Sequence, residues 1–401
     1  MKSGDHISID EKYSAHNYNP LPVVISWAQG VKVRDPEGKE YFDFLSAYSA
    51  VSHGHRHPKI IKALVDQANQ CTLTSRAFYN DRMGPFLGKL CEYSGYEKAL
   101  PMNTGAEAVE TGIKAARRWG VEVKGVKNGS QEIICASGNF HGRTLLAVSM
   151  STDPDSTINY GPYVPGFVHV PYGDAEAIEK AFTPNTVAVI VEPIQGEAGI
   201  IVPPQGYLKA IRALCDKNNA LFIADEVQTG LCRTGRRFAW QREGERPDIM
   251  CLGKALGGGV MPVSAIVADS GVMRVFTPGT HGSTFGGNPL ASAVAIAALE
   301  VLEDEKLEKN AETLGKVFRE EIAKAKCPKM ATVRGMGLLN AVEFEKGFRA
   351  WDVCLALRDA GILAKQTHGN IIRFAPPLVI TEKEIREACG IITMVLEKNV
   401  S

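Results

Sequence analysis

The chain has 401 residues, 45% of them hydrophobic, which is enough to bury a substantial core in more than one domain. Its 45 basic and 45 acidic residues cancel, so the composition argues against binding to nucleic acid or to a membrane surface and favours small polar partners. No apolar run approaches the roughly 18 residues of a membrane span, and the opening residues carry no signal or transit pattern, so we expect a cytoplasmic protein.

The first 70 residues predict a hairpin followed by a helix. Residues 31–33 and 41–45 have the apolar pattern of two hairpin arms. Residues 57–70 are amphipathic, and the apolar face of this helix consists of Ile60, Ile61, Leu64, Val65 and Ala68. We expect residues 1–50 to form an N-terminal segment that joins a smaller domain elsewhere in the chain.

Between residues 103 and 287, short apolar runs alternate with helical patterns, which is typical of a mostly parallel sheet covered by helices on both faces. The expected strands are residues 132–136, 187–191, 221–224, 250–252 and 265–268. Residues 205–219 have helical spacing and complete a βαβ unit. We therefore predict a large α/β domain over residues 51–290.

The pattern changes in the last 110 residues or so, which we expect to form a smaller α+β domain over residues 291–401. The expected helices are residues 288–303, 306–325, 350–360 and 381–398. The expected strands are residues 342–344 and 371–374.

Lys254 and Asp225 are the residues from which we infer the chemistry. Lys254 leaves an apolar run just before a string of glycines, where burial would favour its neutral, nucleophilic amine. Asp225 ends another apolar run and needs a cation if it is buried. A lysine that can bond an aldehyde and an acid that can pair with a pyridinium nitrogen together suggest pyridoxal phosphate. Either residue alone is more often a solvated surface residue or a helix cap. Because parallel strands end at one edge of a sheet, Glu192, Asp225 and Lys254 should lie at the same rim.

Three loops could complete such a site. The backbone N–H groups of Gly105 and Ala106, at the start of a predicted helix, could bind a phosphate, although Thr104 and Glu107 also form an ordinary capping box. In the second loop, Phe140 could stack on a pyridine ring and Arg143 could bind a carboxylate; a core phenylalanine beside a surface arginine is the alternative. In the third, two hydroxyl residues between glycines could provide a further phosphate contact: Ser283 and Thr284.

Two other motifs are discounted. The three histidines in residues 53–57 have no cysteine or carboxylate cluster beside them, so we expect a surface turn and no metal site. Residues 334–340 half-match a dinucleotide fingerprint but lack its third glycine. The nine cysteines are scattered without a C-x-x-C pair and are typical of a reducing compartment.

These motifs, in this order, resemble the class III aminotransferases of the fold-type I pyridoxal-phosphate enzymes, and within them the ornithine aminotransferase branch. The resemblance covers nearly the whole chain and rests on residues 103–108, 138–143, 191–199, 224–230, 252–256 and 281–289. It implies an α/β fold in which a large cofactor-binding domain with a mostly parallel sheet, sandwiched by helices, is followed by a smaller α+β domain. It also implies a homodimer whose active sites lie at the subunit interface.

The resemblance assigns roles to single residues. Lys254 would bond the aldehyde of pyridoxal phosphate, Asp225 would pair with the pyridine nitrogen, and Gln228 would bond the side of the ring that carries the hydroxyl. Ser283 and Thr284 would reach the phosphate from the partner subunit. The full set of cofactor-binding residues that we predict is Thr104, Gly105, Ala106, Phe140, His141, Asp225, Val227, Gln228, Lys254, Ser283 and Thr284.

The resemblance also implies how substrates are chosen. Tyr18, Tyr48 and Arg143 would hold the α-amino acid end of ornithine, so that its distal amine reacts. Glu197 would neutralise Arg373 while ornithine is bound and release it to bind 2-oxoglutarate. The resemblance therefore implies transfer of the δ-amino group of L-ornithine to 2-oxoglutarate, with a place in arginine metabolism and proline biosynthesis. The alternatives are an aminotransferase acting on N-acetylornithine or 4-aminobutyrate, an aminomutase or decarboxylase on the same scaffold, and a non-catalytic binding module.

Overall fold

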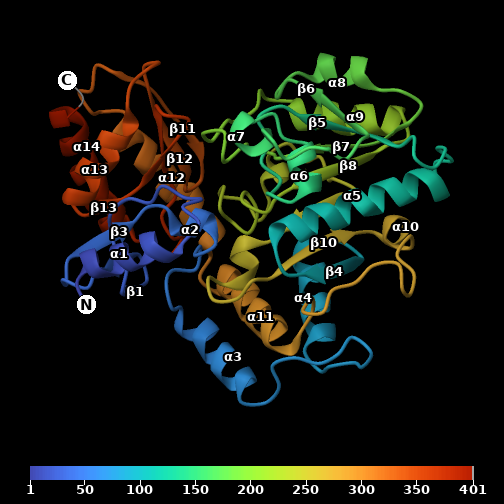
Figure 1. The fold of residues 1–401 in the computed structure, drawn as a ribbon, viewed down its shortest axis with the longest axis horizontal. Helices are drawn as coiled ribbons and strands as arrows, with labels where there is room; N and C mark the ends of the chain where they lie inside the picture. The colour runs from blue at the N-terminus through green and yellow to red at the C-terminus, as the bar shows by residue number, and fades with distance from the viewer. Residues whose placement is uncertain (400–401) are drawn as a thin grey trace.

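The computed structural model describes residues 1–399, and in them the strands form three sheets. A seven-stranded sheet has the order β4-β10-β9-β8-β7-β5-β6, and two four-stranded sheets have the orders β1-β2-β3-β13 and β11-β12-β15-β14. In Figure 1 the large sheet and its helices lie on the right, and the N-terminal and C-terminal parts lie together on the left. No helix of residues 1–399 is long and apolar enough to span a membrane.

The seven-stranded sheet is mostly parallel, as predicted, and β10 is its one antiparallel member. All five predicted strands are present, and two further strands, β4 and β6, were not predicted. The strands are β4 (Lys98–Met102), β5 (Glu132–Ala136), β6 (Phe167–Val170), β7 (Thr186–Val191), β8 (Leu221–Asp225), β9 (Ile249–Leu252) and β10 (Ser264–Ala268).

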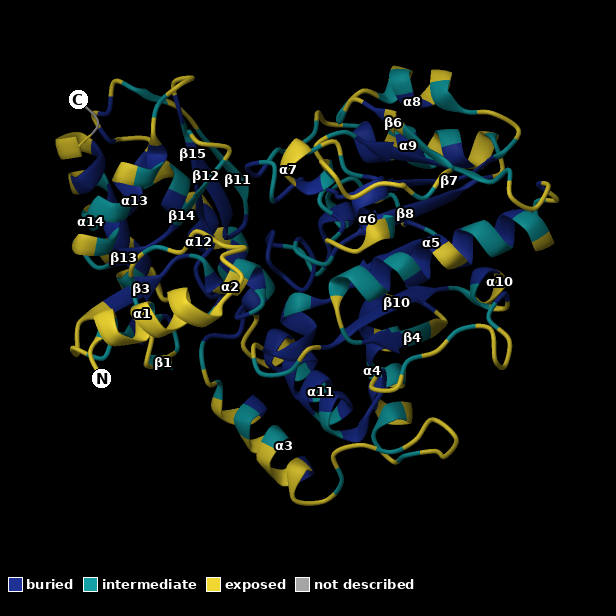
Figure 2. Ribbon diagram, in the orientation of Figure 1, coloured by how far each residue is buried: buried dark blue, intermediate teal, exposed yellow. Residues whose placement is uncertain are grey.

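Helices cover both faces of this sheet, so its central strands are buried throughout (Figure 2). Ile223 of β8 packs in one core cluster with residues of α5 (Gly105–Glu122), whereas its neighbour Phe222 packs in the other with residues of α9 (Tyr207–Lys217). Successive side chains of a strand point to opposite faces, so α5 and α9 lie on opposite sides of the sheet. The shorter helices around it are α6 (Leu145–Ser149), α7 (Pro154–Thr157), α8 (Ala175–Ala181), η1 (Ala239–Arg242) and α10 (Ser270–Met273).

The N-terminal segment pairs with the far end of the chain. After α1 (Ser3–Tyr13) come β1 (Trp27–Gln29), β2 (Lys32–Arg34) and β3 (Glu40–Asp43), and β2 and β3 form the predicted hairpin. Strand β3 then pairs in parallel with β13 (Ile362–Leu363). Residues more than 300 positions apart in the sequence therefore share one small sheet.

The predicted helices and strands of the C-terminal part are present. The helices are α12 (Leu307–Ile322), α13 (Ala350–Asp359) and α14 (Glu382–Asn399), and the strands are β11 (Met330–Met336), β12 (Leu339–Phe344), β14 (Lys365–Thr367) and β15 (Ile371–Phe374). The half-matched dinucleotide fingerprint is the turn of the β11–β12 hairpin.

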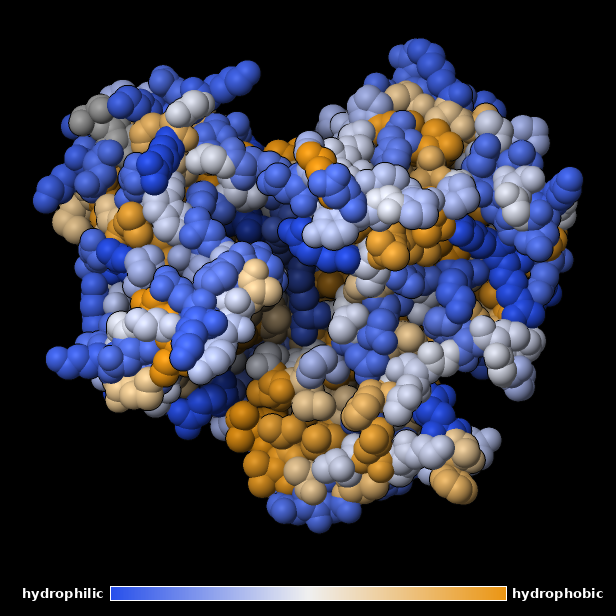
Figure 3. Space-filling view, viewed as in Figure 1, coloured by the Kyte–Doolittle hydropathy of each residue, from blue (hydrophilic) through white to orange (hydrophobic). Residues whose placement is uncertain are grey.

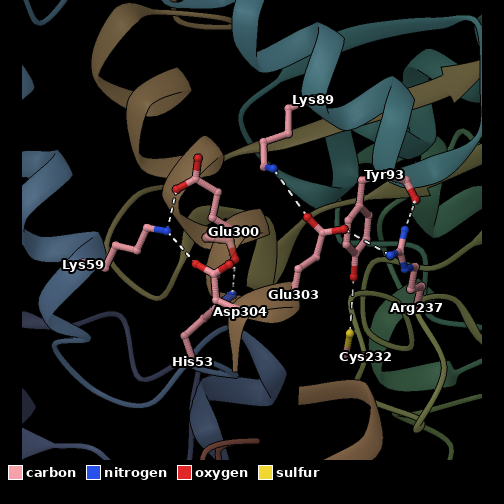
Figure 4. Close-up of polar contacts among 10 residues, drawn as sticks. His53, Lys59, Lys89, Tyr93, Cys232, Arg237, Glu300, Glu303 and Asp304 are labelled. Atoms are coloured by element: carbon pink, nitrogen blue, oxygen red, sulfur yellow. Dashed lines mark hydrogen bonds and ion pairs between the residues drawn. The ribbon is translucent and has the colours of Figure 1, made fainter. Parts of the chain in front are cut away.

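Helix α11 (Pro289–Asp304) packs against α3 (Pro58–Ala68) and α4 (Met83–Ser94). Ion pairs join α11 to these helices (Figure 4): Lys59 of α3 lies 2.7 Å from Glu300 and 2.8 Å from Asp304, and Lys89 of α4 lies 3.5 Å from Glu303. The domain boundary predicted between residues 290 and 291 falls within the first turn of this helix, and the division into domains stays a prediction.

The predicted helix is present as α3, and its apolar face is only partly buried. Ile60 is fully buried, but Val65 is 51% exposed and Ala68 is exposed, while the polar Gln67 is buried. Figure 3 shows hydrophobic side chains gathered in this region of the surface, and the nearby loop exposes Leu73, Phe78 and Tyr79. An exposed apolar patch of this kind is typical of an interface with another protein.

Candidate active site

A cavity of about 180 Å³ opens at the carboxyl edge of the seven-stranded sheet, beside the hollow between the two parts of the molecule (Figure 3). It contains most of the predicted cofactor-binding residues. Its lining consists of Gly105, Ala106, Phe140, His141, Gly142, Glu192, Glu197, Asp225, Val227, Gln228, Thr229 and Lys254.

Three parallel strands bring the ionisable groups of the cavity together. Strands β7, β8 and β9 run in the same direction and end at Val191, Asp225 and Leu252. Glu192, Asp225 and Lys254 therefore reach the same rim, which confirms the predicted placement. Lys254 begins the 3-10 helix η2 (Lys254–Gly257) with a left-handed φ of 44°, directly after Gly253. Such strained backbone is concentrated at functional sites.

The electrostatic setting of Lys254 suits a nucleophilic amine. Burial lowers the pKa of its ammonium group below the usual value, and the nearby carboxylates of Glu197, Asp225 and Glu192 offset this only in part. The neutral amine is consequently easier to reach here than in water. A lysine in this state can attack an aldehyde and can accept a proton.

Asp225 and His141 form a buried pair on the floor of the cavity. His141 Nδ1 lies 2.7 Å from Asp225 Oδ2, and the backbone N–H of Val227 donates to Asp225 Oδ1 at 3.1 Å. Burial alone would lower the pKa of His141, but the hydrogen bond and the charge of Asp225 raise it overall. The carboxylate of Asp225 is thus held in place by donors on two sides.

Glu192 is a further buried acid of the cavity, and its position at the rim was predicted without a role. Its Oε2 accepts the backbone N–H of Phe140 at 2.9 Å, which fixes the loop that carries Phe140 and His141. Burial raises the pKa of Glu192 to about 7. Two other lining residues, Gly142 and Thr229, were not predicted, because neither a glycine nor a threonine in a loop carries a distinctive pattern.

The N-terminus of α5 forms the capping box that the 103–108 turn predicts, and phosphate binding there stays a prediction. Thr104 caps the helix, accepting the Glu107 N–H at 3.2 Å, while Glu107 accepts the Thr104 N–H at 2.7 Å. Thr104 itself does not line the cavity, whereas Gly105 and Ala106 do. The first N–H groups of a helix have no acceptor within the helix, so these two can meet an anion. A Cβ at Gly105 would lie 2.7 Å from Val227 Cγ1, so a larger residue would not fit.

Ser283 and Thr284 do not reach this cavity from their own chain. Ser283 Oγ accepts hydrogen bonds from Asn103 Nδ2 and the Gly286 N–H, each at 2.9 Å, and Thr284 is exposed. Their predicted role requires a second copy of the chain, so it stays a prediction.

Gln228 connects the cofactor side of the cavity with the substrate side. Its Nε2 donates to the backbone carbonyl of Tyr48 at 3.3 Å. Its side chain passes so close to Gly196 that a Cβ there would lie 1.5 Å from Gln228 Oε1. Gly196 is therefore required for Gln228 to take this position.

The predicted switch pair is formed, and Tyr48 lies beside it. Arg373 Nη1 is 2.6 Å from Glu197 Oε1, and the guanidinium carbon of Arg373 is 5.3 Å from the centre of the Tyr48 ring. Burial would raise the pKa of Glu197, but the charges of Arg373 and Lys254 lower it overall. Burial raises the pKa of Tyr48. Glu197 thus carries its negative charge and neutralises Arg373.

Tyr18 and Arg143 are not brought into the cavity. Tyr18 is 68% exposed and lies with Tyr48 along a neighbouring, more apolar cavity. Arg143 is exposed, donates to Ser156 Oγ at 3.1 Å and lies 5.4 Å from the centre of the Phe140 ring. Their predicted contacts with substrate stay predictions. No group of three or more metal-ligating side chains occurs among the described residues.

The lining fits pyridoxal phosphate. A buried carboxylate is available for a pyridinium nitrogen, two free helix N–H groups are available for a phosphate, and a partly buried lysine is available for an aldehyde. His141 Nε2 is buried without a hydrogen-bond partner among the described residues, which leaves a donor or acceptor free at this site. The residues that would hold the group come from β8, the η2 turn and the start of α5.

Three comparisons with known proteins agree with this geometry. The model of the family described as aminotransferase class-III matches residues 13–396. Ornithine aminotransferase of Oceanobacillus iheyensis is 59% identical over 373 residues, which are 93% of each chain. The crystal structure of ornithine aminotransferase from Toxoplasma gondii superposes with a TM-score of 0.97 at 48% identity, covering 99% of this chain and 95% of that one. The acetylornithine aminotransferase of Elizabethkingia anophelis superposes with a TM-score of 0.91 at 50% identity, covering 99% of this chain and all of that one.

Proposed function

The chain belongs to the class III aminotransferases, and on that premise we propose that it transfers the δ-amino group of L-ornithine to 2-oxoglutarate, giving glutamate 5-semialdehyde and L-glutamate. The observation that carries the proposal is the Glu197–Arg373 pair, 2.6 Å apart, beside Tyr48 and within reach of the cavity that Lys254 lines. One pocket must accept a cationic amine in one half-reaction and a dianion in the next. A paired arginine that can be released meets both demands.

Enzymes of this family use pyridoxal phosphate, which when bound supplies an aldehyde that accepts amino groups and a protonated ring that withdraws electrons. In our proposal, the N–H groups of Gly105 and Ala106 would hold its phosphate, and Phe140 and Val227 would contact its ring. Asp225 would favour a protonated pyridine nitrogen, because a buried carboxylate without a cation is costly. His141, hydrogen-bonded to Asp225, keeps that carboxylate oriented.

Lys254 moves the proton. Its Nζ removes a proton from the carbon that bears the reacting amine, which requires the neutral amine that burial favours. In the ornithine half-reaction that carbon is the δ-carbon, because Tyr18, Tyr48 and Arg143 hold the α-amino acid end away from Lys254. Glu197 neutralises the charge of Arg373 during this step. In the second half-reaction Arg373 binds the α-carboxylate of 2-oxoglutarate and Arg143 binds the other carboxylate.

We further propose a homodimer in the cytoplasm, acting in arginine metabolism and proline biosynthesis. The exposed hydrophobic surface at α3 and the loop after it supports a subunit interface. The exposure of Thr284 supports it too, because this residue is predicted to contact the phosphate bound in the other subunit. The nine cysteines form no disulfide, which agrees with a reducing compartment. Sedimentation of the purified protein at roughly twice its 43.4 kDa chain mass would support the dimer.

A second candidate is an N-acetylornithine aminotransferase, which the similarity to the Elizabethkingia protein favours. Single-turnover half-reactions with ornithine, N-acetylornithine and 4-aminobutyrate separate the two candidates. We expect ornithine to have the highest kcat/KM, and 4-aminobutyrate, which has no α-amino group for the tyrosines to contact, to be poor. A higher kcat/KM for N-acetylornithine would overturn the ornithine assignment but leave the aminotransferase chemistry in place.

A further inference from the structure

Tyr48 lies in a strained turn that the rest of the protein must hold in place. Helix α2 (Ser46–Ser49) is left-handed: its residues have φ values of 49°, 46°, 57° and 78°, and none is glycine. A left-handed turn brings Cβ close to the following carbonyl oxygen, so it costs free energy at each residue. Such a conformation persists only where surrounding contacts determine it.

The two ends of the turn are held by different contacts. At its start, the N–H groups of Leu45 and Ser46 donate to Asp43 Oδ1 at 2.9 and 2.8 Å, and Ser46 Oγ donates to the carbonyl of Ala375 at 2.7 Å. At its end, Ser52 Oγ donates to the carbonyl of Ser49 at 2.9 Å. The hydroxyl of Ser52 is fully buried and accepts a hydrogen bond in turn from Arg233.

Arg233 connects this turn to the strand that carries Arg373. Its Nη2 donates to Ser52 Oγ at 2.9 Å, and its Nη1 donates to the carbonyl of Pro376 at 2.6 Å and to that of Leu338 at 3.1 Å. Pro376 lies three residues after Arg373, and Ser52 lies four residues after Tyr48. One guanidinium group therefore bonds to both segments that present the substrate-facing side chains.

The burial of Arg233 is difficult to explain by stability alone. It is 0% exposed, and no carboxylate lies within ion-pair distance of it among the described residues. Burial lowers its pKa to about 9, and the charge of Asp43 offsets this only in part. A buried charge without a counter-ion is unfavourable, so the favourable interactions of Arg233 are its hydrogen bonds to three oxygens. A planar fork of donors, however, is well suited to fixing three backbone and side-chain oxygens in one arrangement.

From this arrangement we propose that Arg233, acting through Ser52, is a positioning residue that holds the Tyr48 turn in register with Arg373 and so sets the preference of the site for ornithine. The inference rests on the proposed function and deepens it. Arg233 does not line the cavity, so it acts through the residues that it orients. Small shifts matter here, since a displacement of about 1 Å in a positioning group can cost on the order of 100-fold in rate.

The test uses Ser52→Ala in the full-length enzyme loaded with pyridoxal phosphate. This change removes the relay hydroxyl and leaves the guanidinium in place. We expect kcat/KM for ornithine to fall about tenfold, mainly through KM, because Tyr48 loses its position. The half-reaction with 4-aminobutyrate, which offers the turn no α-amino acid end, should change less than about twofold. The matched control is Ser292→Ala on α11, which also removes a fully buried hydroxyl but lies outside this network.

Arg233→Lys and Arg233→Met extend the test. A lysine keeps the charge and some donors but cannot span the three oxygens, so Arg233→Lys should lose selectivity for ornithine, though less than Arg233→Met. If the arginine variants fail to fold, Ser52→Ala decides alone. Equal losses with ornithine and 4-aminobutyrate, or no loss with either, would overturn the positioning role. A wild-type enzyme that does not use ornithine would instead overturn the proposed function.

Discussion

The residues on the two sides of the cavity are held in place in different ways. On the cofactor side, Asp225 ends β8, Lys254 follows β9, and Gly105 begins α5, so each position is fixed by the register of one sheet. On the substrate side, Tyr48 lies on a left-handed turn, Glu197 on a loop and Arg373 on β15. Contacts between segments far apart in the chain bring these three residues together. The sheet thus positions the residues that react, whereas contacts outside that sheet position the residues that select the substrate. The second set of contacts can change without moving the first set of residues.

Lys254→Ala should abolish nearly all amino transfer, because it removes the reactive amine on the cofactor side of the cavity. Without a nucleophilic amine and proton carrier, we expect the rate of transfer to fall by about 10⁴-fold for every amino donor alike. Half-reactions with ornithine and glutamate measure this directly, and borohydride reduction followed by mass spectrometry should attach the cofactor to the wild-type chain only. Lys180→Ala, at an exposed site on α8, is the matched control. Wild-type rates in Lys254→Ala would refute its role.

Asp225→Asn should damage the same side less. The amide has nearly the same shape and can keep a hydrogen bond to His141, but it removes the buried negative charge. We expect a loss of about 10²- to 10³-fold, again with equal factors for ornithine and glutamate. If the rate with ornithine and the rate with glutamate fell by different factors, Asp225 would also affect substrate choice, and the division between the two sides of the cavity would be wrong.

Glu197→Gln should affect the substrate side selectively. Arg373 would lose its counter-ion at 2.6 Å and stay available to carboxylates throughout the cycle. We expect the ratio of kcat/KM for ornithine to that for glutamate to fall about tenfold, which corresponds to the net value of one hydrogen bond to a charged group. An unchanged ratio would contradict the switch.

Glu192→Gln should have the smallest effect, on stability and its dependence on pH. The folded pKa of Glu192, about 7, lies above its ordinary value of 4.5, so its protonated form stabilises the fold below pH 4.5 and this contribution is lost as the pH rises through 7. Glutamine stays neutral at every pH. The Tm of the variant relative to that of the wild type should therefore increase by about 1–3 °C as the pH rises from 4.5 to 7. Measured thermal unfolding curves should show no such gain for Glu176→Gln, an exposed site on α8.

The same contrast explains what could be predicted from the sequence. The buried strand ends and the glycine-rich turns are local patterns, so the positions of Lys254, Asp225 and the α5 N-terminus followed from neighbouring residues. The pairing of β3 with β13 and the bonds of Arg233 join residues that the chain separates by more than 100 positions, and no local pattern reports them. The left-handed turn at Tyr48 was also not predictable, since it contains no glycine to signal a positive φ.

The role of Tyr18 came from the resemblance alone, and the resemblance refined the roles that loop patterns suggested for Arg143, Ser283 and Thr284. The structure does not bring these four residues into the cavity. The contacts predicted for these residues require a bound substrate or a second chain. The helix at residues 57–70 was predicted to be amphipathic, but periodicity alone does not distinguish an apolar face that packs within one chain from one that meets another protein.

Isotope transfer tests most directly that the substrate side presents the distal amine of ornithine to Lys254. The enzyme would be incubated with 2-oxoglutarate and ornithine carrying ¹⁵N at either the δ or the α position, and the glutamate formed would be analysed by mass spectrometry. We predict that the δ label appears in glutamate and that the α label stays in the semialdehyde. Appearance of the α label in glutamate would contradict the assignment.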